Sequence, residues 1–304
     1  GKEYTFFRNF VAKPCSIMKK LHCILCTLLW IISTQFVLAN VEIHSTQLTT
    51  VNGLSDNTVR HIYQDSKGFL WVATLNGLNR YDGNSFIKYY PEDTPISLSN
   101  HRIKKVIEDP NGFLWINTYS ETFSCYSLKE DRFIDCIGTG DHHLLYKEIL
   151  LQDDAVWLWG NSDGFARIVY EEGKFTPFFW GTRKGTLNTD HILSIEEGRE
   201  NDIYVRTDKG LYYWKNDSLK QLSNLIFIKS LFYKQSAVFI TSDGEIWTHT
   251  NHSFEKIGEI PLRHQMIITD ALNIQEQCII FTSSESFLFN MRTGQTSKAP
   301  SHYH

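Results

Sequence analysis

Residues 65–83 read DSKGFLWVATLNGLNRYDG, and residues 109–117 begin the same phrase again as DPNGFLWIN. A tryptophan, or a large residue in its place, returns at steps of roughly 35 to 47 residues, the range typical of a four-stranded propeller blade. A fixed period of this length predicts an all-β chain, a β-propeller with six blade repeats. Aligned on this position, the repeats place the same strand at Trp71, Trp115, Trp157, Tyr204, Phe239 and Ile280.

The first repeat divides into four short strands at its turn residues. Asp65 and Gly68 suit a tight turn, because Asp caps its own backbone and Gly tolerates positive φ. The run from residue 69 to 74 (FLWVAT) is almost continuously apolar, as expected for a strand covered on both faces. We therefore predict structural roles, in turns and between blades, for Gly68, Gly112, Trp71, Trp115, Trp157 and Tyr204.

The composition is that of a folded chain with a large core. Of its 304 residues, 42% are hydrophobic and 14% aromatic. The formal net charge is −4, and no basic run is present, which argues against a surface that binds polyanions. Nucleic acid is therefore not an expected partner.

The first 39 residues have the character of an export signal. We expect residues 1–17 to be an upstream segment and residues 18–39 to be a signal peptide. Met18 is followed by two lysines, by an apolar run from residue 21 to 32 and by Val37-Leu38-Ala39, a pattern suited to signal peptidase. An uncleaved transmembrane anchor is the alternative. Residues 40–53 are predicted to be an N-terminal closing strand of a propeller over residues 54–304. The expected blades are 54–91, 98–137, 143–180, 187–223, 226–260 and 266–299.

Three of the six cysteines follow the leader, namely Cys125, Cys136 and Cys278. The first two could form a disulfide if their strands are adjacent. Because the number is odd, buried thiols are the favoured prediction.

The run from Gly53 to Phe86, GLSDNTVRHIYQDSKGFLWVATLNGLNRYDGNSF, closely resembles the two-component regulator propeller repeat. The family's pattern begins G-L-S-x-N-x-V, continues D-x-x-G-x-L-W-[IV]-x-T and ends G-L-x-R-Y-D. The second repeat matches it at residues 98–100 and 112–118. The later repeats keep only the strand rhythm and the small residue before the third strand, at Gly164, Gly210 and Gly244.

This resemblance implies a function outside the cytoplasm. Such repeats form the periplasmic sensor region of hybrid two-component systems in gut Bacteroidetes. The resemblance implies an oligosaccharide derived from a glycan as ligand, a homodimer in the full-length receptor, and a histidine kinase beyond a downstream membrane span. Neither the span nor a kinase motif occurs in this sequence, so no enzyme activity and no cofactor are expected of it. Propellers of this family usually have seven blades, so the six repeats indicate an incomplete ring. A closed six-bladed ring is the alternative.

Motifs for catalysis and for metal binding are weak. The turn D-x-x-G-x-x-W resembles the Asp box of sialidase-like propellers, where it is a structural turn. Adjacent His142 and His143 would point to opposite sides of an extended chain, so we predict no metal site there. A secreted propeller enzyme acting on glycans, sialidase-like or lyase-like, remains an alternative function, as does a scaffold that binds proteins.

A ligand is expected on the loops that join the second strand of a blade to the third, and each blade to the next. Aromatic rings stack on sugars, and charged or amide groups bond their hydroxyls. Packing at a blade edge is the alternative role for the tryptophan among these residues. The predicted ligand-binding residues are Tyr119, His142, Asp163, Trp180 and Arg183.

Overall fold

The computed structural model describes residues 45–94, 96–138, 145–198, 201–233, 236–250, 253–263 and 265–300. The chain divides into two units, Gly1–Gln47 and Leu48–His304, and every described sheet lies in the second unit. The segments predicted as an upstream stretch (1–17) and a signal peptide (18–39) lie outside the described residues. Within the described part of the chain, no helix has the length and hydrophobicity of a membrane span.

The second unit consists of antiparallel sheets, each of four strands in which neighbours along the sequence are neighbours in the sheet. This confirms the predicted all-β propeller with six blade repeats. The first three sheets are β1 (Val59–Gln64), β2 (Leu70–Thr74), β3 (Gly77–Tyr81) and β4 (Phe86–Tyr89); β5 (Ile103–Glu108), β6 (Phe113–Thr118), β7 (Phe123–Ser127) and β8 (Arg132–Ile134); and β9 (Glu148–Leu151), β10 (Ala155–Trp159), β11 (Phe165–Glu171) and β12 (Lys174–Trp180). The others are β13 (Ile192–Glu197), β14 (Ile203–Thr207), β15 (Gly210–Lys215) and β16 (Ser218–Ser223); β17 (Phe227–Tyr233), β18 (Ser236–Thr241), β19 (Glu245–His249) and β20 (Phe254–Glu259); and β21 (Ile268–Ile274), β22 (Gln277–Thr282), β23 (Ser286–Asn290) and β24 (Thr296–Lys298).

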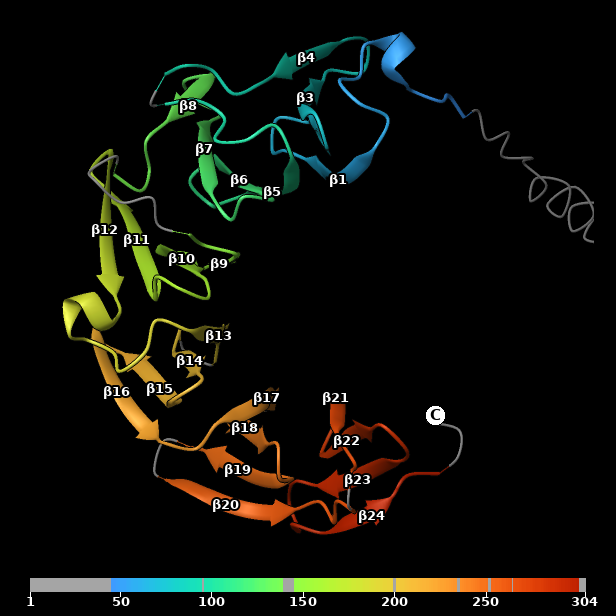
Figure 1. Ribbon diagram of the computed structural model, residues 1–304, viewed down its shortest axis with the longest axis vertical. Helices are drawn as coiled ribbons and strands as arrows, with labels where there is room; N and C mark the ends of the chain where they lie inside the picture. The colour runs from blue at the N-terminus through green and yellow to red at the C-terminus, as the bar shows by residue number, and fades with distance from the viewer. Residues whose placement is uncertain are drawn as a thin grey trace, which may run out of the picture. The chain divides into compact units, whose positions relative to one another are not determined.

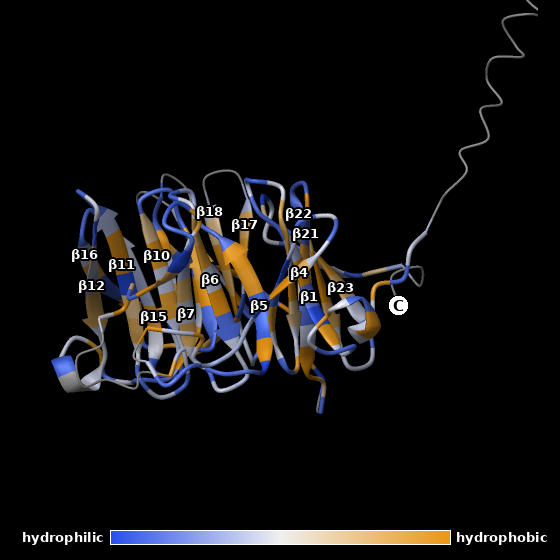
Figure 2. Cartoon of the chain, turned by 90° about the horizontal axis from the view of Figure 1, so that it is seen from above, coloured by the Kyte–Doolittle hydropathy of each residue, from blue (hydrophilic) through white to orange (hydrophobic). Residues whose placement is uncertain are grey.

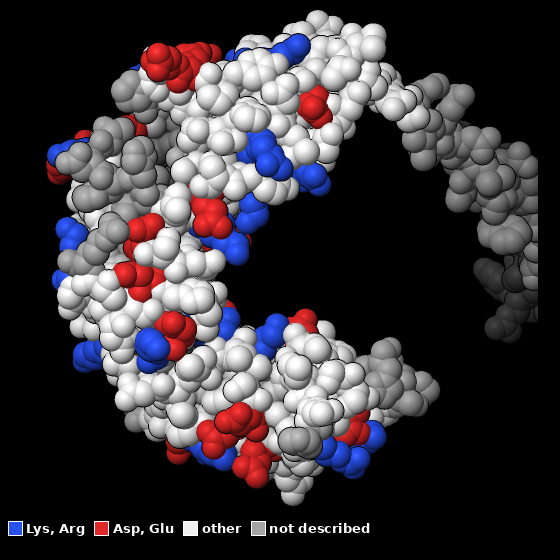
Figure 3. Space-filling view, viewed as in Figure 1, with Lys and Arg blue, Asp and Glu red and all other residues white. Residues whose placement is uncertain are grey.

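Within this second unit, consecutive sheets pack against one another in chain order (Figure 1). The first strand of each sheet lies on the concave side of the row, and the fourth strand lies on the outer side. The first and sixth sheets lie at opposite ends of the row, so the described residues do not form the closed six-bladed ring that was one alternative. Charged side chains lie on both the outer and the concave side (Figure 3).

Five hydrophobic clusters fill the spaces between consecutive sheets. Trp71, Trp115 and Trp157 are fully buried in three of these clusters, and Tyr204 is 5% exposed in a fourth. Removing one such ring from water contributes about 2 to 3 kcal/mol to folding. Figure 2 shows the hydrophobic residues along the strands, with hydrophilic loops at both edges of the sheets. The repeated aromatic position is therefore a packing position between blades.

The structure shifts the alignment of the last two repeats by one residue. Counted from the threonine that ends each second strand, Val238 and Ile279 hold the place that Trp71 holds in the first sheet. Phe239 and Ile280, which the sequence aligns with the tryptophans, point to the opposite face. Phe239 accordingly packs in the cluster between the fourth and fifth sheets. The sequence pattern misses the shift because strands such as AVFIT are apolar on both faces, so hydrophobicity does not set their register.

No strand forms at residues 45–53, the described part of the predicted closing strand 40–53. Instead, η1 (Thr50–Asn52) is a short 3-10 helix capped by the Thr49 side chain, and Gly53 ends it in the left-handed region at φ 107°. The next residues attach to the first blade, because the backbone N–H of Ser55 donates to Asn79 Oδ1 at 2.9 Å. Local capping thus satisfies the polar groups of this segment.

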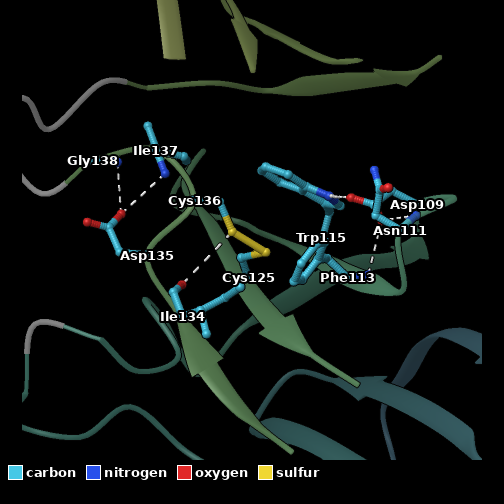
Figure 4. Close-up of a disulfide and its surroundings, with 10 residues drawn as sticks. All are labelled: Asp109, Asn111, Phe113, Trp115, Cys125, Ile134, Asp135, Cys136, Ile137 and Gly138. Atoms are coloured by element: carbon cyan, nitrogen blue, oxygen red, sulfur yellow. Dashed lines mark hydrogen bonds between the residues drawn. A yellow bond between two sulfur atoms is a disulfide. The ribbon is translucent and has the colours of Figure 1, made fainter. Parts of the chain in front are cut away.

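Cys125 and Cys136 form a disulfide with a Cα–Cα distance of 6.2 Å, so the prediction of buried thiols is wrong for these two (Figure 4). Cys125 lies on β7 opposite Ile134, which ends β8 only two residues before Cys136. Strand pairing therefore places the two sulfurs within bonding reach. Cys278 is a free thiol as predicted, and burial raises its pKa to about 12.

Candidate functional site

The loops of each sheet divide between two edges. One edge holds the turns between second and third strands together with the connections between blades, and we call it the connection edge. Backbone bonds join these two kinds of loop: the N–H of Tyr119 donates to Arg102 O at 3.0 Å, the N–H of Tyr146 to Glu121 O at 2.8 Å, and the N–H of Gly164 to Asp190 O at 3.0 Å. Loops from successive blades therefore meet on this edge.

The opposite edge holds the repeated D-x-x-G turns, which serve the fold. Asp109 Oδ1 accepts the backbone N–H groups of Asn111 and Phe113, at 2.9 and 3.0 Å, and its Oδ2 accepts Trp115 Nε1 at 2.8 Å (Figure 4). Burial raises the pKa of Asp109, and the bonds to Trp115 and the backbone oppose that rise. Both oxygens of the carboxylate therefore accept hydrogen bonds from structural donors.

The same kind of hydrogen bond, from a buried indole to a turn residue, recurs with other residues in other blades. Asp65 Oδ2 accepts Trp71 Nε1 at 2.7 Å in the first blade. In the third blade Gln152 Oε1 accepts Trp157 Nε1, also at 2.7 Å. The turn therefore holds the buried indole in place, and its Asp-box appearance gives no sign of catalysis.

Two of the predicted ligand-binding residues lie in connection-edge turns of adjacent blades. Tyr119 follows β6 and is 44% exposed. Asp163 precedes β11, and its Oδ2 accepts the backbone N–H of Leu145 at 3.0 Å, so its carboxylate ties together two loops. His142 lies outside the described residues, and Arg183 lies in η2 (Thr182–Lys184) of the loop after β12.

Trp180 ends β12 and packs among aromatic rings. Its ring stacks on Phe165 with centroids 5.0 Å apart and an interplanar angle of 11°. It meets Trp214 edge to face at the same centroid distance and joins the cluster between the third and fourth sheets. This matches the alternative interpretation of Trp180 as a packing residue.

Tyr119 has polar neighbours that suit a ligand. The Arg102 guanidinium lies over its ring at 5.2 Å from the centroid. Beside it, hydroxyl groups of two loops bond to one another: Ser99 Oγ lies 2.9 Å from Thr122 Oγ1, and Ser120 Oγ lies 3.1 Å from the same atom. Hydroxyls donate and accept, so this group can exchange partners with a polar ligand. An exposed aromatic ring with hydroxyls and a cation beside it provides the kinds of group that bind sugars.

Arg102, Ser99 and Thr122 are not among the residues predicted to bind a ligand. Ser99 lies in the part of the second repeat that resembles the family pattern, which suggests a structural role. Arg102 and Thr122 lie on opposite sides of β5 and β6 in the sequence, and only the packing of the turn on the blade connection brings them to Tyr119.

Comparison with known proteins identifies the repeat. Residues 53–76 match the family model of the two component regulator propeller. A segment of 48 residues is 48% identical to a histidine kinase, P4, of Formosa agariphila. That segment covers 15% of this chain and 4% of the kinase.

Solved structures with similar arrangements include extracellular domains of putative hybrid two component systems from B. thetaiotaomicron. Two of them are 20% and 18% identical to this chain, with TM-scores of 0.47 and 0.49; they cover 84% and 83% of it. The chain spans only 36% and 37% of their lengths. The computationally designed protein Ika8 has a TM-score of 0.51 at 12% identity. The matched region includes 79% of this chain and 74% of the Ika8 chain. The chain has the β-propeller fold, and its residues 53–76 match the two component regulator propeller repeat.

Proposed function

We propose that this propeller is the ligand-sensing part of an extracytoplasmic two-component receptor, and that it binds an oligosaccharide at Tyr119 on the connection edge. The observation that carries the proposal is the exposed Tyr119 ring beside Arg102 and a group of mutually bonded hydroxyls. The repeat at residues 53–76 and the histidine kinase relative support the signalling role. An export signal at residues 18–39 would place the domain in the periplasm.

The loop contacts suggest how a bound ligand would act. Backbone bonds connect the Tyr119 turn to Arg102 at the start of its own blade, and the adjacent Glu121 to Tyr146 at the start of the next. A ligand on this edge would therefore touch the junction of two blades. In a homodimeric receptor, a ligand that favours one arrangement of this junction would shift the population of receptor states. The kinase that responds would lie outside this sequence.

Calorimetric titration of the purified chain with a panel of plant and host oligosaccharides tests the proposal. We expect one class to bind, Tyr119→Ala to weaken that binding at least about tenfold (about 1.4 kcal/mol), and Tyr119→Phe to retain most of it. Phe178→Ala is the matched control, because Phe178 is equally exposed, at 45%, but lies on the outer strand β12.

Three results would contradict the proposal. Cleavage of a polysaccharide by the purified chain would indicate the alternative of a glycan-degrading enzyme. Tight binding of a protein with no response to saccharides would indicate a scaffold. Equal losses in Tyr119→Ala and Phe178→Ala would place the ligand elsewhere.

A further inference from the structure

A bulge recurs at the start of the first strand in five of the six sheets. In each, the first strand has one residue more than the second strand over the same stretch, so that extra residue has no partner across the strands. Bulges redirect side chains and are common beside functional sites. The residues at this unpaired place are Arg60, Lys104, Leu193, Ile228 and Thr269. In the third sheet, Lys147 holds the corresponding place just before β9, where its N–H donates to Trp159 O.

The first three blades differ from the last three in charge at this place. Arg60, Lys104 and Lys147 are all basic, whereas the later blades have only uncharged residues there. The next residue along each first strand is His61, Lys105 and Glu148 in the first half, and Ser194, Lys229 and Asp270 in the second. We call Arg60, Lys104, Lys105 and Lys147 the cation row. Figure 3 shows Lys and Arg side chains on the concave side, where the first strands lie.

Most of the cation row is not neutralised by neighbouring acids. Lys104 Nζ pairs with Glu148 at 3.1 Å. Arg60, Lys105 and Lys147 are exposed and form no ion pair with any described residue. In the later blades the comparable charges cancel, because Lys229 Nζ pairs with Asp270 at 2.9 Å. The bulge positions of the first three blades and the residues after them thus carry more positive than negative charge, although the chain as a whole is negative.

The pKa of His61 responds to burial and also to the positive charge of the cation row. His61 lies between the first two blades, where its Nδ1 accepts the backbone N–H of Val106 at 3.4 Å. Burial, and then the positive charge of Lys105, lower the pKa of His61. The neutral ring adds no charge of its own at neutral pH and leaves the cations to act on a ligand.

The cation row continues into the Tyr119 site. Arg102 directly precedes β5, and Lys104 lies at the bulge of that strand, with one residue between them in the sequence. A chain-like ligand with one ring at Tyr119 can therefore extend along the first strands toward Lys105 and Arg60. Sugar rings alone would not need three unpaired cations, whereas carboxylate or sulfate groups would complement them.

We propose that the cation row and Tyr119 form one elongated site for an anionic oligosaccharide, with carboxylate or sulfate groups on Arg60, Lys105 and Lys147. This inference rests on the proposed function and adds the chemical class of the ligand. Overall composition conceals such a site, since its cations come from three separate repeats.

Titration of the full chain with three probes of similar length tests the inference: oligogalacturonate, which is carboxylated, sulfated chondroitin oligosaccharides, and neutral xylo-oligosaccharides. We expect at least one anionic probe to bind at least about tenfold more tightly than the neutral one, and we expect its affinity to fall with added salt. The triple variant Arg60→Gln, Lys105→Gln, Lys147→Gln should weaken anionic binding at least about tenfold. The matched control is Lys88→Gln, Lys174→Gln, Lys220→Gln, three exposed lysines of the outer strands β4, β12 and β16.

The outcomes separate this inference from the proposed function. If the neutral probe binds best, or if the triple variant binds the anionic probe as the wild type does, the inference is wrong and oligosaccharide sensing still stands. Equal losses in both triple variants would show nonspecific attraction and overturn the inference. If no saccharide binds, both proposals are wrong. Preference between the carboxylated and the sulfated probe identifies the anionic group.

Discussion

Trp115 Nε1, within β6, donates a hydrogen bond at 2.8 Å to Oδ2 of Asp109, which lies in the turn before that strand, and both residues are buried. Asp109 therefore connects turn geometry to the packing of the second and third sheets. Asp65 and Trp71 repeat the arrangement one blade earlier. The relationship explains why the two residues recur together in the sequence.

Asp109→Ala should lower the free energy of unfolding by about 2 to 3 kcal/mol, because it leaves the Trp115 indole and two backbone N–H groups without acceptors. Urea unfolding followed by tryptophan fluorescence measures the change. Asp109→Asn should cost less, since its amide oxygen can still accept the two backbone N–H groups that Asp109 Oδ1 accepts. Equal effects of the two variants would contradict a role based on hydrogen bonding.

Reduction of the Cys125–Cys136 disulfide should lower stability by about 2 to 3 kcal/mol, because it releases a short closed loop in the unfolded chain. Denaturation with and without reductant tests this, and mass spectrometry before reduction should find the bond. Cys125→Ser with Cys136→Ser should remove the response to reductant. Cys278→Ser is the control and should keep it, since Cys278 is free.

Asp131 should contribute to the loss of folding stability at acidic pH. Bonds from the Arg80 guanidinium and from Tyr126, whose hydroxyl lies 2.8 Å from Asp131 Oδ1, lower the pKa of Asp131 below 3.8. A lowered folded pKa gives stability that is present above 3.8 and is lost as pH falls through the folded pKa. Asp131→Asn should therefore reduce stability more at pH 7 than at pH 2.5. The opposite order of the two effects would refute this linkage.

Variants of Trp180 and Tyr119 should differ in their effect on stability, because Trp180 packs in the fold and Tyr119 is proposed to bind the ligand. Trp180→Ala removes a ring stacked on Phe165 and should cost about 2 to 3 kcal/mol of unfolding free energy. Tyr119→Ala removes an exposed ring and should cost less than about 1 kcal/mol. Thermal unfolding of both variants measures this. A large loss in Tyr119→Ala would mean that its ring supports the fold.

The sequence by itself determined the blade. The turn chemistry at Asp65 and Gly68 and the apolar strand that follows act within about ten residues, so they can be interpreted without a structure. The return of Trp71 at Trp115, 44 residues later, is visible in the sequence as a repeat. The period then predicts the six four-stranded sheets. Strand order also places the turns between second and third strands and the connections between blades on one edge, where the ligand is proposed to bind.

Only the tertiary structure decided which residues from different repeats meet. Strands that are apolar on both faces do not determine their own register, so Val238 rather than Phe239 takes the tryptophan position. The Cys125–Cys136 bond depends on the pairing of β7 with β8. In the cation row, Arg60 and Lys104 take equivalent places because β1 and β5 each have a bulge there, although 43 residues lie between them in the sequence. Local propensity depends on residues close together in the sequence, whereas these contacts join residues that are farther apart in the sequence.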